Sequence, residues 1–169
     1  MRGPDRGVRK EQQFLYPSEA VQFLACDEVP LAFRRVVALA ICLYPRAGEL
    51  AELRWEDVDL EHGTIHIHRT RDRVTGKGKG TKTGQACRFA IEAALLPLLR
   101  AMHGEASGKG RVVAMPRDNS NLCRVLLLWL QRAGVVRAEL HEGSATRKNL
   151  TFHDLRATAA RGPRCAATT

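Results

Sequence analysis

Residues 39–60 read LAICLYPRAGELAELRWEDVDL, and this stretch governs how the rest of the chain is interpreted. An apolar run, 36–43, precedes Arg46, and a second apolar segment with helical spacing, 47–53, follows it. The pattern predicts two buried helices that meet at one arginine. A guanidinium at such a junction is always charged and can bind two phosphate oxygens at once. The alternative is an ordinary helix N-terminus, in which Glu49 in the first turn complements the helix dipole.

The composition indicates a polyanionic partner. The chain has 27 Lys and Arg against 18 Asp and Glu, a net charge of +9, and its 169 residues fit one domain. Nucleic acid is the commonest partner of such a protein, although solubility alone is an alternative explanation of the charge. Aromatic residues make up only 5% of a largely aliphatic chain, which favours helices over a β-sandwich or barrel.

The cysteines and the hydropathy pattern point to the cytoplasm. The five cysteines are widely separated and form no C-x-x-C pair, which favours reduced thiols over disulfides or a zinc site. No apolar run reaches the roughly 18 residues that a membrane span needs. The N-terminus also lacks a signal-peptide pattern. We therefore expect a cytoplasmic protein without a membrane partner.

Prolines and helical spacing divide the first part of the chain. Residues 1–13 are polar and contain Gly and Pro, so we expect a disordered lead-in or linker remnant. Pro17 is suited to open a first helix. Pro30 separates that helix from a second one over about 31–43, and the third helix is the 47–53 segment already described.

A strand with alternating polarity follows. Residues 64–69 alternate with period two, so that Ile65 and Ile67 face the core. His66 and His68 share the opposite face. A metal site at this H-x-H pair is an alternative, but the sequence offers no third ligand, and we expect no metal.

The next segment is basic and rich in glycine. Residues 70–85 contain almost no apolar side chain, and a second alternating strand follows at 87–91. Together these strands predict a small antiparallel sheet whose long loop, or short middle strand, carries Lys77, Lys79 and Lys82. Such lysines fit a solvated loop and a phosphate-contacting hairpin equally well.

The remaining apolar segments are helical. Residues 92–106 have helical spacing, with Pro97 as a possible distortion, and 122–133 form a strongly apolar helix closed by Gly134. Residues 135–150 are interpreted as a basic linker.

A last helix, 151–158, carries His153 and Arg156. Residues three apart lie on one helix face, so these two side chains can address a single anion, although a plain surface pair is the alternative. Residues 159–169 contain no large apolar side chain. We therefore expect the inner face of this helix, and the nearby 122–130 segment, to be partly uncovered.

The order of these elements resembles the catalytic domain of the tyrosine recombinases, the phage integrase family. Arg46 in RAGEL, followed by LRWEDVDL, resembles the first arginine box of that family. Lys82 in GTKTGQACRFAI resembles its hairpin lysine, and His153 and Arg156 in HDLRAT resemble its second box. The resemblance covers about residues 14–158. It implies an α+β, mainly α fold: a helical bundle with a small antiparallel three-stranded sheet.

The resemblance also implies DNA strand exchange, integration or recombination, without a metal or nucleotide cofactor. In the family a tyrosine attacks the scissile phosphate, which forms a 3′-phosphotyrosine and frees a 5′-hydroxyl. Arg46 and Arg156 would bind the non-bridging oxygens, Lys82 would protonate the leaving oxygen, and His153 would assist proton transfer. The hairpin lysines and the two arginines would contact double-stranded DNA, and other recombinase subunits are further expected partners.

The sequence departs from the family pattern in two places. Tyr44 and Pro45 stand where the family usually has a small, glycine-containing turn. The family's later His/Trp position and its nucleophilic tyrosine lie beyond the second box, but the only tyrosines here are Tyr16 and Tyr44. We expect Tyr44 to have a structural, packed role. We therefore predict a fragment that is inactive alone, with a partial catalytic domain over 14–158 and a non-family tail over 159–169.

Three hypotheses remain open for such a chain. It is a truncated or frameshifted remnant of a mobile element, a DNA-binding module that regulates a full-length relative, or a partial enzyme that receives its tyrosine in trans. The composition of the tail is typical of a GC-rich gene read out of frame. Under the first hypothesis, another reading frame past codon 158 encodes the missing tyrosine segment.

Overall fold

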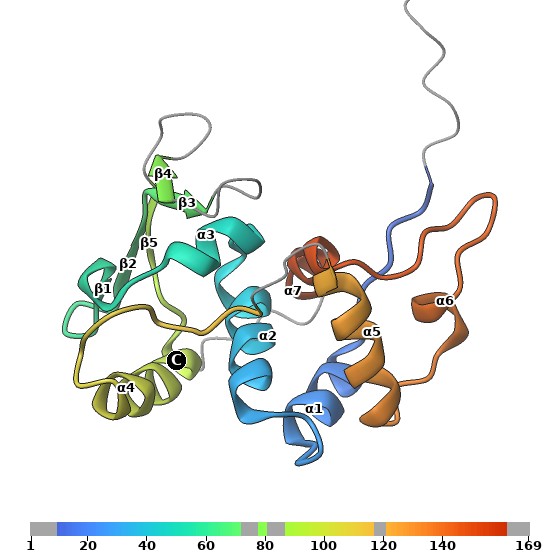
Figure 1. Ribbon diagram of the computed structural model, residues 1–169, viewed down its shortest axis with the longest axis horizontal. Helices are drawn as coiled ribbons and strands as arrows, with labels where there is room; N and C mark the ends of the chain where they lie inside the picture. Colours follow the sequence, from blue (N-terminus) through green and yellow to red (C-terminus); the bar gives the residue numbers. More distant parts are fainter. Residues whose placement is uncertain (1–9, 72–77, 81–86, 117–120, 162–169) are drawn as a thin grey trace, which may run out of the picture. The chain divides into compact units, whose positions relative to one another are not determined.

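The computed structural model describes residues 10–71, 78–80, 87–116 and 121–161 (Figure 1). The chain divides into two compact units, one made of Met1–Val29 and Ser120–Thr169 and the other of Pro30–Asn119. The first unit contains α1 (Pro17–Ala25), α5 (Leu122–Arg132), α6 (Ala138–His141), the 3-10 helix η4 (Phe152–Asp154) and α7 (Leu155–Arg161). The second contains α2 (Leu31–Leu43), α3 (Ala47–Glu52), η1 (Trp55–Asp57), β1 (Val58–Asp59), β2 (Thr64–Ile67), β3 (Arg69–Arg71), β4 (Gly78–Gly80), β5 (Cys87–Ala90), η2 (Ala93–Leu95) and α4 (Leu96–Glu105).

Helix α2 is the apolar centre of the second unit. It begins after Pro30 and ends at Leu43, as its helical spacing predicted, and most of its side chains are buried. Arg35 on α2 donates two hydrogen bonds of 2.7 Å to the Glu105 carboxylate on α4. Pro97 lies in the first turn of α4, where a missing N–H disrupts no helical hydrogen bond, so it does not distort the helix.

The strands form two small antiparallel sheets. The three-stranded sheet has the order β1-β2-β5, and Ile65 and Ile67 are buried as the alternation predicted. The predicted fold class, mainly helical with a small three-stranded antiparallel sheet, is confirmed. Among the residues that the structure describes, the lysine-bearing strand β4 pairs with β3 in a separate two-stranded sheet and not with the three-stranded one. The chain leaves the first sheet at His68. The Nε2 atom of this histidine is hydrogen-bonded to Asp57 Oδ1 at 2.8 Å.

Helix α5 is the apolar centre of the first unit. It ends at Arg132, and Gly134 directly beyond it adopts a φ of 77°, the left-handed conformation that favours glycine at a helix end. Leu122, Leu126 and Leu130 are each at most 3% exposed. Along the described segments, no helix is both long and apolar enough to cross a bilayer.

Two segments that the sequence suggested were unstructured cover this unit. The Glu11 backbone N–H donates to Thr146 O at 2.8 Å, so the end of the expected lead-in, residues 10–13, is bound to the expected linker. Within 135–150 the chain forms α6 and buries Leu140 and Leu150 completely. The expectation of an uncovered last helix was therefore wrong.

The last helix is tied to the N-terminal segment by a buried hydrogen bond. The backbone N–H of Leu15 donates to Thr158 Oγ1 at 3.1 Å, and Leu15 and Leu155 are both fully buried. The covering groups come from residues 10–16 and 135–150, whose apolar side chains occur singly or in short runs within polar sequence. Such positions show no period, so sequence pattern alone does not reveal them.

Candidate nucleic-acid interface

Arg46 lies at the junction of α2 and α3, where it is the N-cap residue of α3. Its backbone N–H and its Nη1 donate to the two carboxylate oxygens of Glu49, at 2.8 and 3.0 Å. The Arg46 side chain is 60% exposed, whereas that of Glu49 is 12% exposed. The first-turn glutamate therefore tethers one edge of the guanidinium and leaves the group at the surface.

The turn before Arg46 is made by Tyr44 and Pro45. Tyr44 ends α2 with φ 54° and ψ 26°. This left-handed conformation costs a residue other than glycine about 1–2 kcal/mol. A glycine-containing turn would adopt the same backbone without that strain. At this turn Pro45 is buried, whereas Tyr44, which was expected to pack, is 37% exposed. The proline is therefore the more deeply buried residue of the two.

The lysine-bearing segment is described only in part. Lys79 lies on β4, where it is paired with Thr70 of β3, so a short strand carries this lysine as one of the two predicted alternatives. Lys77 and Lys82 lie outside the described residues.

His153 and Arg156 lie on two consecutive helical segments rather than on one α-helix. His153 is in η4 and is exposed, and Arg156 is in the first turn of α7 and is half-buried. Residues three apart lie nearly above one another in 3-10 geometry and are neighbours in α-helical geometry. Both side chains therefore leave the same side of this segment.

Asp154 fixes the start of that segment. It accepts hydrogen bonds from the backbone N–H of Thr151 at 2.8 Å and from the Thr151 hydroxyl at 2.6 Å, and it is buried. These two bonds form a cap at the N-terminus of η4. Cys123 lies nearby: burial, and then the negative charge of Asp154, raise the pKa of its thiol. That thiol is hydrogen-bonded to Leu150 O at 3.1 Å.

The predicted residues fall into two sets, one in each compact unit. Arg46 and the β3–β4 pair belong to Pro30–Asn119, and His153 and Arg156 belong to the other unit. Each set is held by local capping: Glu49 beside Arg46, and Asp154 with Thr151 beside His153.

A model of the phage integrase family matches residues 13–162 and so includes both arginine boxes. The chain belongs to this family. A search among curated proteins finds no match.

The fold of this integrase-family chain is similar to three solved structures of known recombinases. The integrase of the Tn1549 transposon, in complex with transposon right end DNA, has a TM-score of 0.66 and 15% identity over 93% of this chain and 54% of that one. The XerA recombinase has a TM-score of 0.62 and 20% identity, over 94% and 51% of the two chains. The lambda integrase bound to DNA has a TM-score of 0.53 and 20% identity, over 92% and 53%. The chain thus spans about half the length of the structures that it matches.

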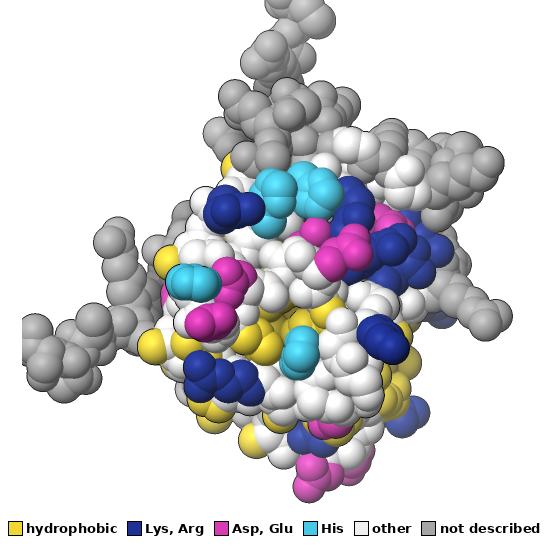
Figure 2. Space-filling model, turned by 90° about the vertical axis from the view of Figure 1, so that its left-hand side faces the viewer, with side chains coloured by type: hydrophobic (Ala, Val, Ile, Leu, Met, Phe, Trp, Pro, Cys, Tyr) yellow, Lys and Arg dark blue, Asp and Glu magenta, His cyan; other side chains and the backbone are white. Residues whose placement is uncertain are grey.

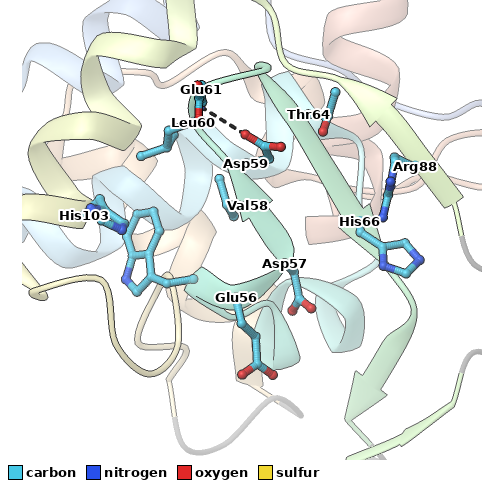
Figure 3. A pocket seen from close by; sticks show the side chains of 11 residues that line it. Glu56, Asp57, Val58, Asp59, Leu60, Glu61, Thr64, His66, Arg88 and His103 are labelled. Atoms are coloured by element: carbon cyan, nitrogen blue, oxygen red, sulfur yellow. Dashed lines mark hydrogen bonds between the residues drawn. The ribbon is translucent and has the colours of Figure 1, made fainter.

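The integrase-family domain also contains a pocket that the sequence did not suggest. Its volume is about 560 Å³. Figure 3 shows that His66 and Arg88 lie side by side on neighbouring strands at one edge of it, as their cross-strand pairing requires. The lining residues are Trp55, Glu56, Asp57, Val58, Asp59, Leu60, Glu61, Thr64, His66, Arg88 and His103. Among the described side chains on the face shown in Figure 2, acidic, basic and histidine groups are intermixed.

One acidic group of this pocket, Asp57, is engaged inside the fold. Asp57 accepts two hydrogen bonds from Arg69 Nη2, at 2.8 and 2.7 Å, and one from the His68 ring. Burial raises the pKa of Asp57, but the hydrogen bonds from Arg69, His68 and the Arg54 backbone outweigh it and hold the pKa below its usual range. The His66 and His68 rings are stacked 4.5 Å apart. In the part of the chain that the structure describes, no group of three His, Cys, Asp or Glu side chains could hold a metal ion.

Sequence reasoning missed Gly48, Glu52 and Asp57, which contact the lysine-bearing strand pair. Glu52 is almost completely buried, and its partner Arg111 lies far away in the sequence, at 2.9 Å in space. The only signal was a charged residue inside an apolar helical run, between Ala51 and Leu53. Nothing in that pattern identifies the cation that compensates it.

Proposed function

We propose that this chain is the phosphate-binding part of a DNA site-specific recombinase or integrase, and that it binds double-stranded DNA through residues 14–158. The observation that carries the proposal is the family match over residues 13–162, within which Arg46 is an exposed cation at a helix junction. The lambda and Tn1549 integrases were solved with DNA, which gives the proposal further support. A cytoplasmic location is part of the same proposal.

The proposed roles follow the family's chemistry residue by residue. Arg46 and Arg156 bind the non-bridging oxygens of the phosphate, where a planar guanidinium can donate two parallel hydrogen bonds. Lys82 protonates the leaving 5′ oxygen, and His153 assists proton transfer. Lys77 and Lys79 contribute charge to the DNA backbone contact.

A second part of the proposal is that the chain does not itself form the covalent bond to DNA. The ring of Tyr16 lies 4.3 Å from the Arg137 guanidinium, in a cation–π contact at the start of α1. Tyr44 is held at the left-handed end of α2. Neither tyrosine lies beyond the second box. If the chain acts as a partial enzyme, the tyrosine comes in trans from another subunit. The alternative function, a DNA-binding regulatory module, has the same DNA contact and no chemistry.

Fluorescence anisotropy with a labelled duplex across a salt series tests the DNA contact. Each neutralised phosphate contributes about 0.9 to the slope of log K against log salt. Arg46→Gln should therefore lower that slope by about 0.9. Arg100→Gln, at an exposed position on α4, makes the same charge change and should leave the slope unaltered. Binding that is independent of salt, or equal effects of the two variants, would contradict the proposed site.

A nicked suicide substrate tests the chemistry. The chain alone should give no covalent protein–DNA adduct after denaturation. An adduct that disappears in Tyr44→Phe would show that Tyr44 is a nucleophile and would overturn the non-covalent role. Adduct formation only when a tyrosine-bearing family member is added would favour donation of the tyrosine in trans over the regulatory module.

A further inference from the structure

Strand β3 is attached to the segment that follows Arg46. Its first residue, Arg69, donates to both oxygens of the buried Asp57 carboxylate on η1, at 2.8 and 2.7 Å. A second guanidinium nitrogen of Arg69 forms an ion pair of 2.7 Å with Glu56. The start of the hairpin strand is therefore fixed to η1 by both terminal nitrogens of one guanidinium, Nη2 shared between the two Asp57 oxygens and Nη1 paired with Glu56.

The middle of β3 lies against the first turn of α3. A Cβ atom added at Gly48 would be 2.6 Å from Thr70 Oγ1 and 3.0 Å from the Arg71 carbonyl oxygen. No side chain fits between helix and strand at that point, so glycine is required by the close approach of the two backbones. Figure 1 shows α3 packed beside β3 and β4.

The end of β3 is attached through Glu52, the last residue of α3. The Glu52 side chain is only 3% exposed, and its Oε1 lies 2.9 Å from Arg111 Nη2 and 3.9 Å from Arg71 Nε. Its carboxylate also reaches β4, because a Cβ added at Gly78 would be 3.2 Å from Glu52 Oε2. One buried carboxylate thus contacts both strands of the pair and a distant arginine.

Arg111 is itself held by the backbone. Arg54 and Arg111 form an isolated antiparallel β-bridge, and Val112 N–H donates to Leu53 O at 2.9 Å. The cation that compensates Glu52 therefore belongs to a fixed backbone. A buried carboxylate is costly to desolvate, and breaking its ion pair by removing one partner is strongly destabilising.

We propose that Glu52 is a positioning residue that, together with Gly48 and Asp57, fixes the β3–β4 pair on the helix that Arg46 caps. All three residues of β3 contact the segment 48–57, and β3 is paired with the lysine-bearing strand β4, so this strand and the first arginine share one support. This inference rests on the proposed function. Holding β3–β4 beside Arg46 serves a purpose only if Arg46 and the lysines bind the same DNA.

The test compares Glu52→Gln with Glu61→Gln, a change of the same charge at an exposed position of the same unit. In both variants the net charge rises by one, so electrostatics alone predicts equal or slightly tighter DNA binding. A positioning role predicts the opposite sign for Glu52→Gln: weaker binding to a labelled duplex by about threefold or more, with Glu61→Gln unchanged or tighter.

Hydrogen exchange without DNA is the second readout. In Glu52→Gln we expect the amides of residues 69–71 and 78–80 to exchange about tenfold faster, while those of α2 keep their protection. Equal loss of protection in α2 would show that Glu52 serves only global stability, and it would overturn the positioning role. Unchanged exchange at 69–71 and 78–80 would overturn it as well.

Gly48 provides an independent variant if Glu52→Gln does not fold. Gly48→Ala should also accelerate exchange in β3 and β4, and Thr70→Ala in the same chain should restore part of the protection by removing the hydroxyl that clashes. No acceleration in Gly48→Ala, or no restoration in the double variant, would contradict the close contact. If wild type binds no duplex, the proposed function fails, but the exchange results still decide whether this support exists.

Discussion

Replacing Asp154 by alanine should destabilise the segment that carries His153 and Arg156. Asp154 is buried and accepts two hydrogen bonds from Thr151, of 2.8 and 2.6 Å. Asp154 is the third residue of the capping box whose N-cap is Thr151, so its loss leaves the Thr151 N–H and hydroxyl without their acceptor. A donor left without a partner costs about 1–3 kcal/mol, and with two donors affected we expect a loss of about 2–3 kcal/mol in the free energy of unfolding.

Equilibrium urea denaturation and a thermal scan measure this loss. For a chain of this size the melting temperature should fall by about 5–10 °C. Hydrogen exchange should accelerate first at 151–158. Glu142→Ala, at an exposed position in the same unit, makes the same charge change and should stay within about 0.5 kcal/mol. An equal effect of the two substitutions would refute the capping argument.

A second readout separates the charge of Asp154 from its role as a cap. Asp154→Asn keeps an oxygen that can accept from Thr151 but removes the negative charge that raises the pKa of Cys123. The pKa of that thiol should therefore fall toward its usual value. Alkylation by iodoacetamide should become faster at a fixed pH, since the thiolate is the reactive form. Unchanged alkylation would mean that burial alone sets the pKa of the thiol.

Three further predictions concern pH, a glycine and a surface ion pair. The pKa of Asp57 is below its ordinary value of 3.8, since hydrogen bonds outweigh the effect of burial, so its contribution is present above that pH and is lost as the pH falls through the lower, folded value. Urea midpoints of wild type and Asp57→Asn should differ at pH 7 and converge as the pH falls through the lowered, folded pKa of Asp57. Gly134→Ala should cost about 1–2 kcal/mol in urea denaturation, because φ is 77° and the added Cβ would lie 2.8 Å from Gln22 Nε2. Arg35→Ala should cost no more than about 1 kcal/mol, and less at high salt, because its partner Glu105 is 56% exposed.

Much of the fold could be predicted because its signals are local. Helices α1 and α2 begin beside prolines and follow a continuous helical period, and the structure has both at the predicted positions. The alternation of Ile65 and Ile67 likewise predicted a half-buried strand. In each case the residues that set the element are adjacent in the sequence.

The cover of the first unit could not be predicted for the opposite reason. Leu140 and Leu150 are fully buried, but each stands alone in a basic, polar segment. The helix that contains Leu140, α6, has only four residues, too few to show a period. Their burial depends on packing against distant segments, which single-sequence patterns do not contain.

The candidate site was predictable only as a set of residue types. The sequence marks Arg46, His153 and Arg156, but it gives no reason to expect that Gly48, Glu52 and Asp57 hold a strand. The ion pair between Glu52 and Arg111 forms across 59 residues of chain. Such pairs depend on tertiary structure, so the support of a site is less visible in sequence than the site itself.

The same internal pairing limits how the net charge of +9 acts on DNA. Several arginines are bound to carboxylates within the fold: Arg35 to Glu105, Arg69 to Asp57, Arg111 to Glu52 and Arg137 to Glu19. A guanidinium engaged in this way has fewer donors for phosphate. Arg46 is also paired, through Nη1 with Glu49, but its side chain stays 60% exposed. DNA binding should therefore come from a few local contacts and not from a uniform basic surface. If four phosphates are neutralised on binding, the slope of log K against log salt should have a magnitude of about 3.6. A much larger slope would mean that the paired arginines exchange their carboxylates for phosphates when DNA binds.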